Sequence, residues 1–387
     1  MKLHCLNNIS QYGLNLLSKK YEITKDVHES DLILVRSAVM HDMEIPHNLI
    51  AVGRAGAGVN NIPLDKFAKA GIVVFNTPGA NANGVKELVL AGMLMSVRDI
   101  HGGLNWVHNN ASDPEIAKTV EKAKAQFGGT EIFGKSIGIV GLGAIGILVA
   151  NACHALGMKV YGFDVYFTEE RRHLLPTDFT FCDSLDELYA LSDFITLHVP
   201  LTPDTKGMIN QETLSIMKDG VVILNYSRDS LVDDDAMEKA LQAKKVRKYV
   251  TDFPNPRTAN MEGVLCIPHL GASTEESEDN CAMMAVRQLV NYAETGSIAN
   301  SVNFPACDLP LCESDARLAI LHENKPTILN TLTEIISKNP KTKITKLVNN
   351  VRGDVAYTVY DIDNASIEEI QNNLKTISGI FRIRVIK

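Results

Sequence analysis

Three glycines and one aspartate in this sequence have the spacing that a dinucleotide-binding site requires. Gly141, Gly143 and Gly146 directly follow the apolar run at 136–140, and Asp164 ends the next apolar run. The first glycine permits a tight turn, the second lets the backbone approach a pyrophosphate, and the third lets a helix pack closely on its strand. A carboxylate at position 164 can accept hydrogen bonds from ribose hydroxyls and would repel a 2′-phosphate. The pattern therefore predicts NAD, rather than NADP, as the cofactor.

Two further residues have the side-chain chemistry that the oxidation of an alcohol carbon needs. His269 follows the apolar run at 265–267, and an imidazole, with an ordinary pKa of about 6.5, suits proton exchange around neutrality. Arg228 follows the apolar run at 221–224, and its planar guanidinium can bind a carboxylate through two parallel hydrogen bonds. Removal of a hydride requires a base for the hydroxyl proton and a cation near the developing oxygen charge. The alternative for His269 is a structural histidine, and the alternative for Arg228 is an ordinary surface ion pair.

A third candidate, Arg54, is the only cation in the glycine-rich segment 53–61, which follows the apolar run at 49–52. Open α/β sheets bind ligands at the carboxyl ends of their strands, where this segment would lie. Because the chain has a formal net charge of −8, an anionic substrate needs a local cation of this kind. The alternative is a solvated arginine in a surface loop.

Composition limits the class of protein. A chain of 387 residues is long enough for two or three domains. Its negative charge argues against a nucleic-acid partner or an anionic membrane surface, and no apolar run reaches the roughly 18 residues that span a bilayer. The seven cysteines are scattered without a CxxC pair, which suits a reducing compartment. We therefore expect a cytoplasmic protein without nucleic-acid or membrane partners.

Short apolar runs alternate with helical patterns through most of the chain, which predicts parallel α/β sheets. The expected strands are 32–35, 49–52, 72–75, 136–140, 159–163, 194–197, 221–224, 249–251 and 265–267. A polar, helical stretch is expected over 106–126. After residue 311 the pattern changes to strand, helix, strand, strand, helix and strand. The predicted fold is two Rossmann-like, doubly wound parallel-sheet domains followed by a ferredoxin-like α+β domain.

Four segments together carry a family resemblance. The segments 53–61 and 225–233, the glycine loop with Asp164, and the stretch Pro-His-Leu-Gly-Ala-Ser-Thr at 268–274 resemble those of the D-isomer-specific 2-hydroxyacid dehydrogenases. The resemblance implies NAD-dependent oxidation of 3-phosphoglycerate at C2, the first step of serine synthesis. It also implies that His269 is the general acid and base, that Arg228 orients the substrate, and that the chain forms a homodimer or homotetramer.

The resemblance also implies domain boundaries and further site residues. The substrate-binding domain would comprise 1–98 and 285–305, the NAD-binding Rossmann domain 99–284, the linker 306–314 and an ACT-like domain 315–387. The expected substrate contacts are Arg54, Ala55 and Gly56. The expected dinucleotide contacts are Thr77, Gly141, Gly143, Ala144, Ile145, Gly146, Asp164, Val199, Tyr226, Ser227, Arg228, Asp252, His269, Gly271 and Ala272. His322 and Asn324 are candidate regulatory residues, because 322–326 resembles the loop at which ACT domains bind serine. No metal is expected.

The sequence departs from the family pattern at two positions near the expected active site. Asp229 stands where the family has glycine, and we expect it to point away from Arg228, because an ion pair would compete with substrate. Asn255 stands where the family has the glutamate that pairs with its histidine. Without that carboxylate, His269 should titrate closer to its free value, unless another acid, with Asp252 as the one to test, has taken the role.

The C-terminal loop matches the ACT pattern only in part, with Thr327 in place of a glycine and Lys343 in place of an asparagine. A structural or dimer-forming role therefore stands beside serine binding. Two other functions also stay open for the whole chain. One is another D-2-hydroxyacid dehydrogenase, of the glycerate or glyoxylate type. The other is an NAD-dependent binding module or corepressor, which would not need both Arg228 and His269.

Overall fold

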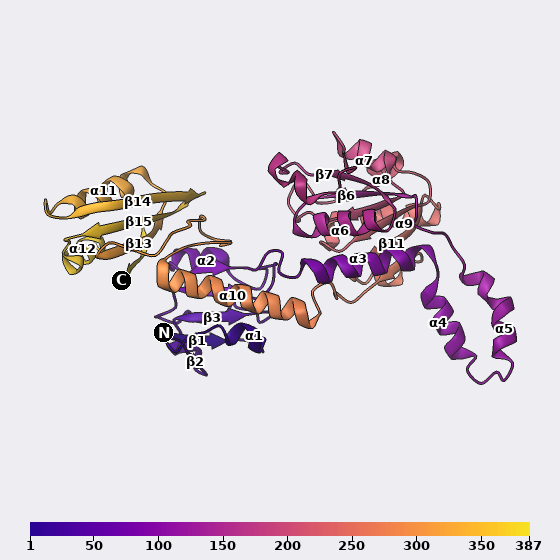
Figure 1. Ribbon diagram of the computed structural model, residues 1–387, viewed down its shortest axis with the longest axis horizontal. Helices are drawn as coiled ribbons and strands as arrows, with labels where there is room; N and C mark the ends of the chain where they lie inside the picture. Colours follow the sequence, from indigo (N-terminus) through magenta and orange to yellow (C-terminus); the bar gives the residue numbers. More distant parts are fainter. The chain divides into compact units, whose positions relative to one another are not determined.

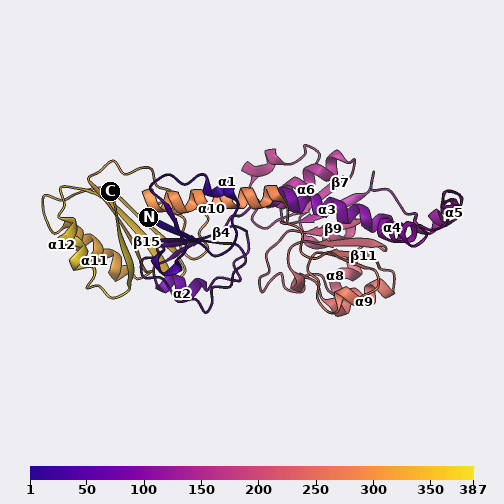
Figure 2. The ribbon, with the colours of Figure 1, turned by 90° about the horizontal axis from the view of Figure 1, so that it is seen from below.

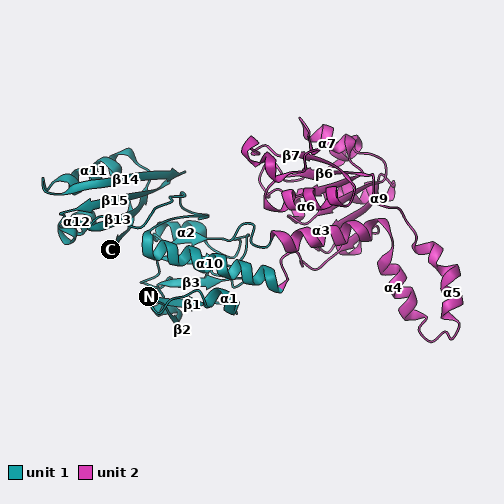
Figure 3. Ribbon diagram, in the orientation of Figure 1, with its two compact units in different colours: residues 1–81, 275–387 teal, residues 82–274 magenta.

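The computed structural model describes all 387 residues, which form two compact units. Unit 1 comprises 1–81 and 275–387, and unit 2 comprises 82–274 (Figure 3). The chain crosses between them at 81/82 and 274/275, whereas the sequence suggested crossings at 98/99 and 284/285. The difference arises because α3 (Ala82–Val97) packs against the sheet and helix α6 (Ala144–Ala155) of unit 2. None of the helices combines the length and apolarity that crossing a membrane requires.

The N-terminal part of unit 1 is a five-stranded parallel sheet in the order β2-β1-β3-β4-β5. Its strands are β1 (Lys2–Cys5), β2 (Glu22–Thr24), β3 (Leu32–Val35), β4 (Ala51–Arg54) and β5 (Val73–Phe75). Helices α1 (Gln11–Leu14) and α10 (Glu275–Thr295) cover one face, and α2 (Leu64–Lys69) covers the other (Figure 2). Because both faces are covered, β3 is buried along its whole length, as its continuous apolar sequence predicts. Arg54 is the last residue of β4, which lies later in the sequence than the expected 49–52.

Unit 2 is built on a seven-stranded parallel sheet in the order β12-β11-β10-β9-β6-β7-β8. Its strands are β6 (Ser136–Val140), β7 (Lys159–Phe163), β8 (Thr180–Phe181), β9 (Phe194–Leu197), β10 (Val221–Asn225), β11 (Val246–Thr251) and β12 (Val264–Cys266). Helices α3 and α6 pack on one face, and α7 (Leu185–Leu191), α8 (Gln211–Ile216) and α9 (Asp234–Gln242) on the other. Strand β6 pairs with β7 on one side and β9 on the other, so the strand order reverses there. Such a switch point is where doubly wound sheets bind ligands.

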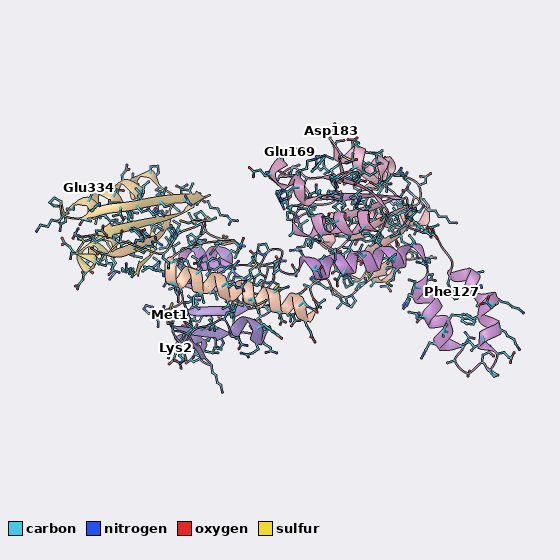
Figure 4. The ribbon with its side chains drawn as sticks, in the orientation of Figure 1. Met1, Lys2, Phe127, Glu169, Asp183 and Glu334 are labelled. Carbon is cyan, nitrogen blue, oxygen red and sulfur yellow. The ribbon has the colours of Figure 1, made fainter.

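The polar stretch before β6 forms an arm of two helices, α4 (Ile100–Asn109) and α5 (Ile116–Ala123), rather than one helical segment (Figure 1). Neither helix has a buried residue. Phe127, labelled in Figure 4, follows α5, and its side chain lies beside Gly103 of α4. The two helices of the arm therefore enclose no buried core.

The C-terminal domain is a four-stranded antiparallel sheet in the order β14-β15-β13-β16. Its strands are β13 (Ala316–Glu323), β14 (Lys343–Arg352), β15 (Val355–Asp363) and β16 (Ile380–Ile386), and its helices are α11 (Pro326–Ser337) and α12 (Ile367–Leu374). Residues of both helices share one apolar cluster with residues of the sheet. This is the expected ferredoxin-like arrangement, and with the two parallel sheets it confirms the predicted fold class.

Side chains of the C-terminal domain bind the last turn of α10. Arg317, which is fully buried, makes a bidentate pair with Asp361 at 2.6 and 2.7 Å and donates to the carbonyl oxygen of Thr295 at 2.8 Å. Arg384 donates to the carbonyl oxygens of Tyr292 and Ala293, with its guanidinium 4.3 Å from the centre of the Tyr292 ring. Carbonyls at a helix C-terminus lack intrahelical partners, and cations there also oppose the helix dipole favourably. The C-terminal domain therefore supplies hydrogen-bond donors to the carbonyl oxygens at the end of α10.

We expect Arg317→Ala to lower the free energy of unfolding by about 3–5 kcal/mol, because it leaves the buried Asp361 carboxylate without its counter-ion. Urea unfolding followed by circular dichroism measures the change. Lys325→Ala, which removes the cation of the exposed Lys325–Glu323 pair, is the matched control and should cost less than about 1 kcal/mol. Equal losses for the two variants would contradict the structural role of Arg317.

Candidate active site

The glycine loop after β6 has the geometry that its sequence predicts. Gly141 has φ +93°, and a Cβ there would lie 2.6 Å from the carbonyl oxygen of His198. A Cβ on Gly146 would overlap the carbonyl oxygen of Gly141, so this glycine lets α6 start directly against the turn. A Cβ on Gly143, in contrast, would meet nothing within 4 Å. The space in front of Gly143 is therefore open for a pyrophosphate to approach the backbone.

The start of α6 and the carboxylate of Asp164 lie beside this loop. Gly143 caps α6 without a side-chain hydrogen bond, so the first N–H groups of the helix are left for an anion. Asp164 accepts the N–H of Leu142 through Oδ2 and the N–H of Tyr166 through Oδ1, both at 2.7 Å. Each carboxylate oxygen has a second lone pair with which to accept from a ribose hydroxyl. The residues present therefore fit a bound NAD.

The segment after β9 packs against the glycine loop. His198 bonds the hydroxyl of Thr196 through Nε2 at 2.9 Å, and its buried Nδ1 has no partner. Burial lowers the pKa of His198 to about 3, so this ring is neutral at physiological pH. A methyl group of Val199 would lie 2.9 Å from a Cβ on Gly141. His198 and Val199 therefore shape the loop by packing.

The turn after β10 holds Arg228 at the C-terminal edge of the same sheet. Asn225 donates through Nδ2 to the carbonyl oxygen of Arg228 at 2.8 Å and accepts the N–H of Ser227 at 3.1 Å. The Ser227 hydroxyl donates to the carbonyl oxygen of Leu197, the last residue of β9, at 2.7 Å. The Arg228 guanidinium donates to the carbonyl oxygen of Ser227 at 2.6 Å. These bonds join the ends of β9 and β10 and fix the backbone that carries Arg228.

Asp252 connects this turn with His269. The backbone N–H of His269 donates to the carbonyl oxygen of Asp252 at 3.0 Å, and the N–H of Gly271 donates to Oδ2 of Asp252 at 3.2 Å. The His269 ring lies 4.7 Å from the ring of Phe253, centre to centre. The pKa of the Asp252 carboxyl is raised, because burial outweighs the charges of His269 and Arg228, which lower it. The structure thus brings Arg228, Asp252 and His269 together at one edge of the sheet.

Asn255 occupies a structural turn. Its Nδ2 donates to Asp229 at 3.0 Å and to Asp234 at 2.9 Å, and its Oδ1 accepts the backbone N–H groups of Arg257 and Thr258. The Asp229 carboxylate accepts from Asn255, and no ion pair joins it to Arg228. The amide therefore serves as a bridge between loops and does not pair with the histidine.

In unit 1, the loop after β4 is held by the turn after β5. Thr77, which is fully buried, accepts the N–H of Gly56 through its hydroxyl at 2.8 Å and donates its own N–H to the carbonyl oxygen of Gly56 at 3.1 Å. Gly56 has φ +152°, and a Cβ there would overlap the guanidinium of Arg54. The lack of a side chain at position 56 therefore lets the Arg54 side chain lie over the loop. Ala55, the third expected substrate contact, is buried beside it.

The structure adds a second cation, Arg36, which the sequence analysis did not select. Arg36 follows β3, whose last residue Val35 pairs in register with Arg54 of β4. Its guanidinium lies 2.7 Å from the carboxylate of Glu278 on α10. Burial raises the pKa of the Cys281 thiol, and the Thr77 side chain and the charges of Arg54 and Arg36 lower it. Arg36 could have been found by the signal that identified Arg54, a cation directly after an apolar strand.

The two candidate regulatory residues are bonded within the C-terminal domain. The buried His322 ring bonds the carbonyl oxygen of Glu323 through Nδ1 and the hydroxyl of Thr358 through Nε2, both at 2.7 Å. Burial lowers the pKa of this histidine. Asn324 donates through its side chain to the carbonyl oxygen of Gly353 at 3.0 Å. Serine binding by these residues stays a prediction.

Comparison with known proteins identifies the class. Residues 90–271 match the family model described as D-isomer specific 2-hydroxyacid dehydrogenase, NAD binding domain. Over 94% of this chain and 88% of the relative, the sequence is 32% identical to D-3-phosphoglycerate dehydrogenase of Haemophilus influenzae. It is also 32% identical to the Escherichia coli protein of the same name, over 87% of this chain and 82% of that protein.

A solved structure shows the same relationship. The NAD⁺-bound 3-phosphoglycerate dehydrogenase of Entamoeba histolytica superposes with a TM-score of 0.62 at 26% identity, covering 78% of this chain and 98% of that one. The parallel sheets, the glycine loop and these matches define an NAD-dependent oxidoreductase. The chain belongs to the D-isomer-specific 2-hydroxyacid dehydrogenase family.

Two glycine substitutions should have opposite effects. Gly143→Ala places a methyl group in open space, so we expect stability within about 0.5 kcal/mol of the wild type but NAD affinity reduced at least about tenfold. Gly146→Ala forces a methyl group into backbone, so we expect it to cost about 1–3 kcal/mol of stability. Urea unfolding and calorimetric titration with NAD measure the two quantities. Unchanged NAD binding by folded Gly143→Ala would contradict the assignment of the loop.

Proposed function

We propose that this chain oxidises 3-phospho-D-glycerate to 3-phosphohydroxypyruvate with NAD, as the first step of serine biosynthesis. The observation that carries the proposal is the pair of arginines, Arg36 and Arg54, at the ends of the neighbouring strands β3 and β4. Relatives that match most of this chain are named D-3-phosphoglycerate dehydrogenase. A phosphorylated substrate has several negative charges in an acidic protein, and Arg54 supplies a cation for them. Arg36 supplies a second one if the substrate replaces its partner Glu278.

The residues of unit 2 account for the chemistry at C2. Bound NAD supplies the acceptor for the hydride. We assign His269 as the general base that takes the C2 hydroxyl proton, because a neutral imidazole can accept it near neutral pH. We assign Arg228 as the cation that pairs with the substrate carboxylate and stabilises the developing charge on the C2 oxygen. In the reverse direction the protonated His269 returns the proton to that oxygen.

Two other functions compete with this proposal. Oxidation of an unphosphorylated acid, of the glycerate type, would not need a pair of arginines at β3 and β4. A binding module or corepressor would need the glycine loop but neither Arg228 nor His269. Arg228 and His269 follow β10 and β12, which both pair with β11, and a cation and an imidazole at one sheet edge favour an enzyme.

We expect the chain to turn over 3-phosphoglycerate with a much higher kcat/KM than D-glycerate. Arg54→Gln should reduce kcat/KM for 3-phosphoglycerate by about 10- to 100-fold through KM, because it removes charge-assisted hydrogen bonds to the phosphate. Activity on D-glycerate should change little. Arg257→Gln, which removes a surface cation paired with Asp235 and Glu238, is the control and should leave both activities unchanged. Equal losses on both substrates in Arg54→Gln would contradict a phosphate contact.

We also propose that the chain forms a homodimer through the arm formed by α4 and α5. The arm exposes apolar side chains that have no core to enter, with Ile100 at 44%, Leu104 at 66% and Val107 at 48% exposure. Exposed apolar residues gathered on one short helix are typical of a surface that a partner covers. A second copy of the arm presents the same residues and so offers the matching surface.

Leu104→Asp is therefore expected to convert the oligomer to monomer, because it places a charge at the centre of the apolar surface. Light scattering coupled to size-exclusion chromatography measures the mass. Val39→Asp is the control, since Val39 is 71% exposed but lies in a loop of unit 1. An unchanged mass for folded Leu104→Asp would place the interface elsewhere.

We also propose that serine regulates this protein by binding to the C-terminal domain. Its support is the partial resemblance of 322–326 to an ACT ligand loop together with the ferredoxin-like fold. The internal hydrogen bonds of His322 and Asn324 mean that serine would have to replace existing partners. The alternative to serine regulation is a structural role for the C-terminal domain at the end of α10.

A further inference from the structure

The loop that carries Arg36 is held by the side chain of Asn7, which lies between β1 and α1. Oδ1 of Asn7 accepts the backbone N–H groups of Arg36, Ser37 and Ala38, at 2.9, 3.1 and 3.0 Å. Successive N–H groups that converge on one acceptor form a nest, a turn with a defined backbone path. The amide of Asn7 therefore fixes the course of the chain directly after β3.

This loop is also joined to the loop that carries Arg54. The N–H of Ala55 donates to the carbonyl oxygen of Val35 at 2.8 Å, where β4 and β3 end. The side chain of Asn61 donates through Nδ2 to the carbonyl oxygen of Ala38 at 2.8 Å. The backbones that carry the two arginines therefore belong to one hydrogen-bonded frame.

The Arg36 side chain is held less firmly than its backbone. Its guanidinium pairs with Glu278 at 2.7 Å, and both side chains are partly exposed. An exposed ion pair of this kind contributes little to stability, so an anion with more charge than a carboxylate can replace Glu278. The loop can then stay in place while the guanidinium exchanges one anion for another.

We propose that Asn7 is a positioning residue for Arg36 and that it thereby sets the affinity for the phosphate group of the substrate. The inference rests on the proposed function in taking Arg36 as a phosphate contact. A guanidinium that binds two phosphate oxygens at once needs a defined orientation, and the fixed backbone supplies it. Asn7 acts through the three N–H groups of the loop and does not touch the substrate.

The alternative is that Asn7 only stabilises unit 1. A purely stabilising amide would, when removed, lower the free energy of unfolding and leave the substrate affinity of the folded protein unchanged. The direction of the hydrogen bonds favours positioning, because all three come from the residue that carries the cation and from the two residues after it.

The test measures binding of 3-phosphoglycerate to the full chain saturated with NADH, by calorimetry, together with steady-state kinetics. Asn7→Ala is expected to raise the Kd and the KM for 3-phosphoglycerate by about 5- to 20-fold, because the guanidinium loses its fixed position. The kcat should change by less than about twofold, since the groups that act at C2 are unaltered. Activity on D-glycerate, which has no phosphate, should likewise be unaffected.

A double-mutant cycle with Arg36→Gln separates positioning from a general loss of stability. Arg36→Gln alone should raise the Kd by about 10- to 100-fold, because it removes charge-assisted hydrogen bonds to the phosphate. In that background Asn7→Ala should raise the Kd by less than about a further twofold, because no guanidinium is left to position.

Two further variants serve as controls. Asn7→Asp keeps an oxygen that can accept the three N–H groups, so its Kd should stay within about threefold of the wild type. Asn210→Ala removes an amide in unit 2 whose Oδ1 also accepts two backbone N–H groups, those of Glu212 and Thr213. This variant should lose stability, as for any helix cap, and keep the wild-type Kd. Circular dichroism verifies that each variant folds.

The outcomes separate this inference from the proposed function. An unchanged Kd in folded Asn7→Ala, beside a raised Kd in Arg36→Gln, would overturn the inference and leave the proposed function standing. Equal effects of Asn7→Ala in the wild type and in Arg36→Gln would also overturn it. A chain that binds 3-phosphoglycerate without oxidising it would overturn the proposed function, and the cycle would still decide the role of Asn7. A chain without affinity for 3-phosphoglycerate would overturn both.

Discussion

Parallel pairing of strands places all of their carboxyl ends at one edge of a sheet, and the site in unit 2 depends on this constraint. Gly141 after β6, Asp164 after β7, Arg228 after β10 and Asp252 after β11 come from distant parts of the sequence. Hydrogen bonds between the strand ends, such as that from Ser227 to Leu197, hold these turns together. Each turn can then carry one functional group while the buried strands hold the geometry.

The distribution of charge at this edge differs from that expected of the family. Asn255 replaces a carboxylate and Asp229 replaces a glycine, and the two side chains bond each other. We expected the Asp229 carboxylate to point away from Arg228, and it accepts a hydrogen bond from the amide of Asn255. The Arg228 guanidinium, which we propose to bind the substrate carboxylate, therefore has no ion pair with Asp229. The charges of Arg228 and His269 both lower the pKa of the Asp252 carboxyl, which burial raises.

The C-terminal domain uses buried charge in a structural way. Arg317 is fully buried, and its desolvation is offset by a bidentate pair with Asp361 and by the carbonyl oxygens at the end of α10. Arg384 binds the same helix end from β16. The opposite end of α10 carries Glu278, which pairs with Arg36 near the loop of Arg54. One helix therefore joins the C-terminal domain to the cations proposed to bind phosphate.

The amino-acid sequence by itself determined the doubly wound sheets, the ferredoxin-like domain and the close packing around Gly141 and Gly146, because period, spacing and turn chemistry are local properties. It did not show that Arg36 lies beside Arg54, since strands β3 and β4 become neighbours only through long-range pairing. Nor did it show that Tyr226 packs so closely on α3 that a Cβ on Gly92 would overlap its hydroxyl. The partners of Asn255 and the burial of Asp252 were likewise decided by tertiary structure, because hydrogen bonds and desolvation depend on which segments meet in space.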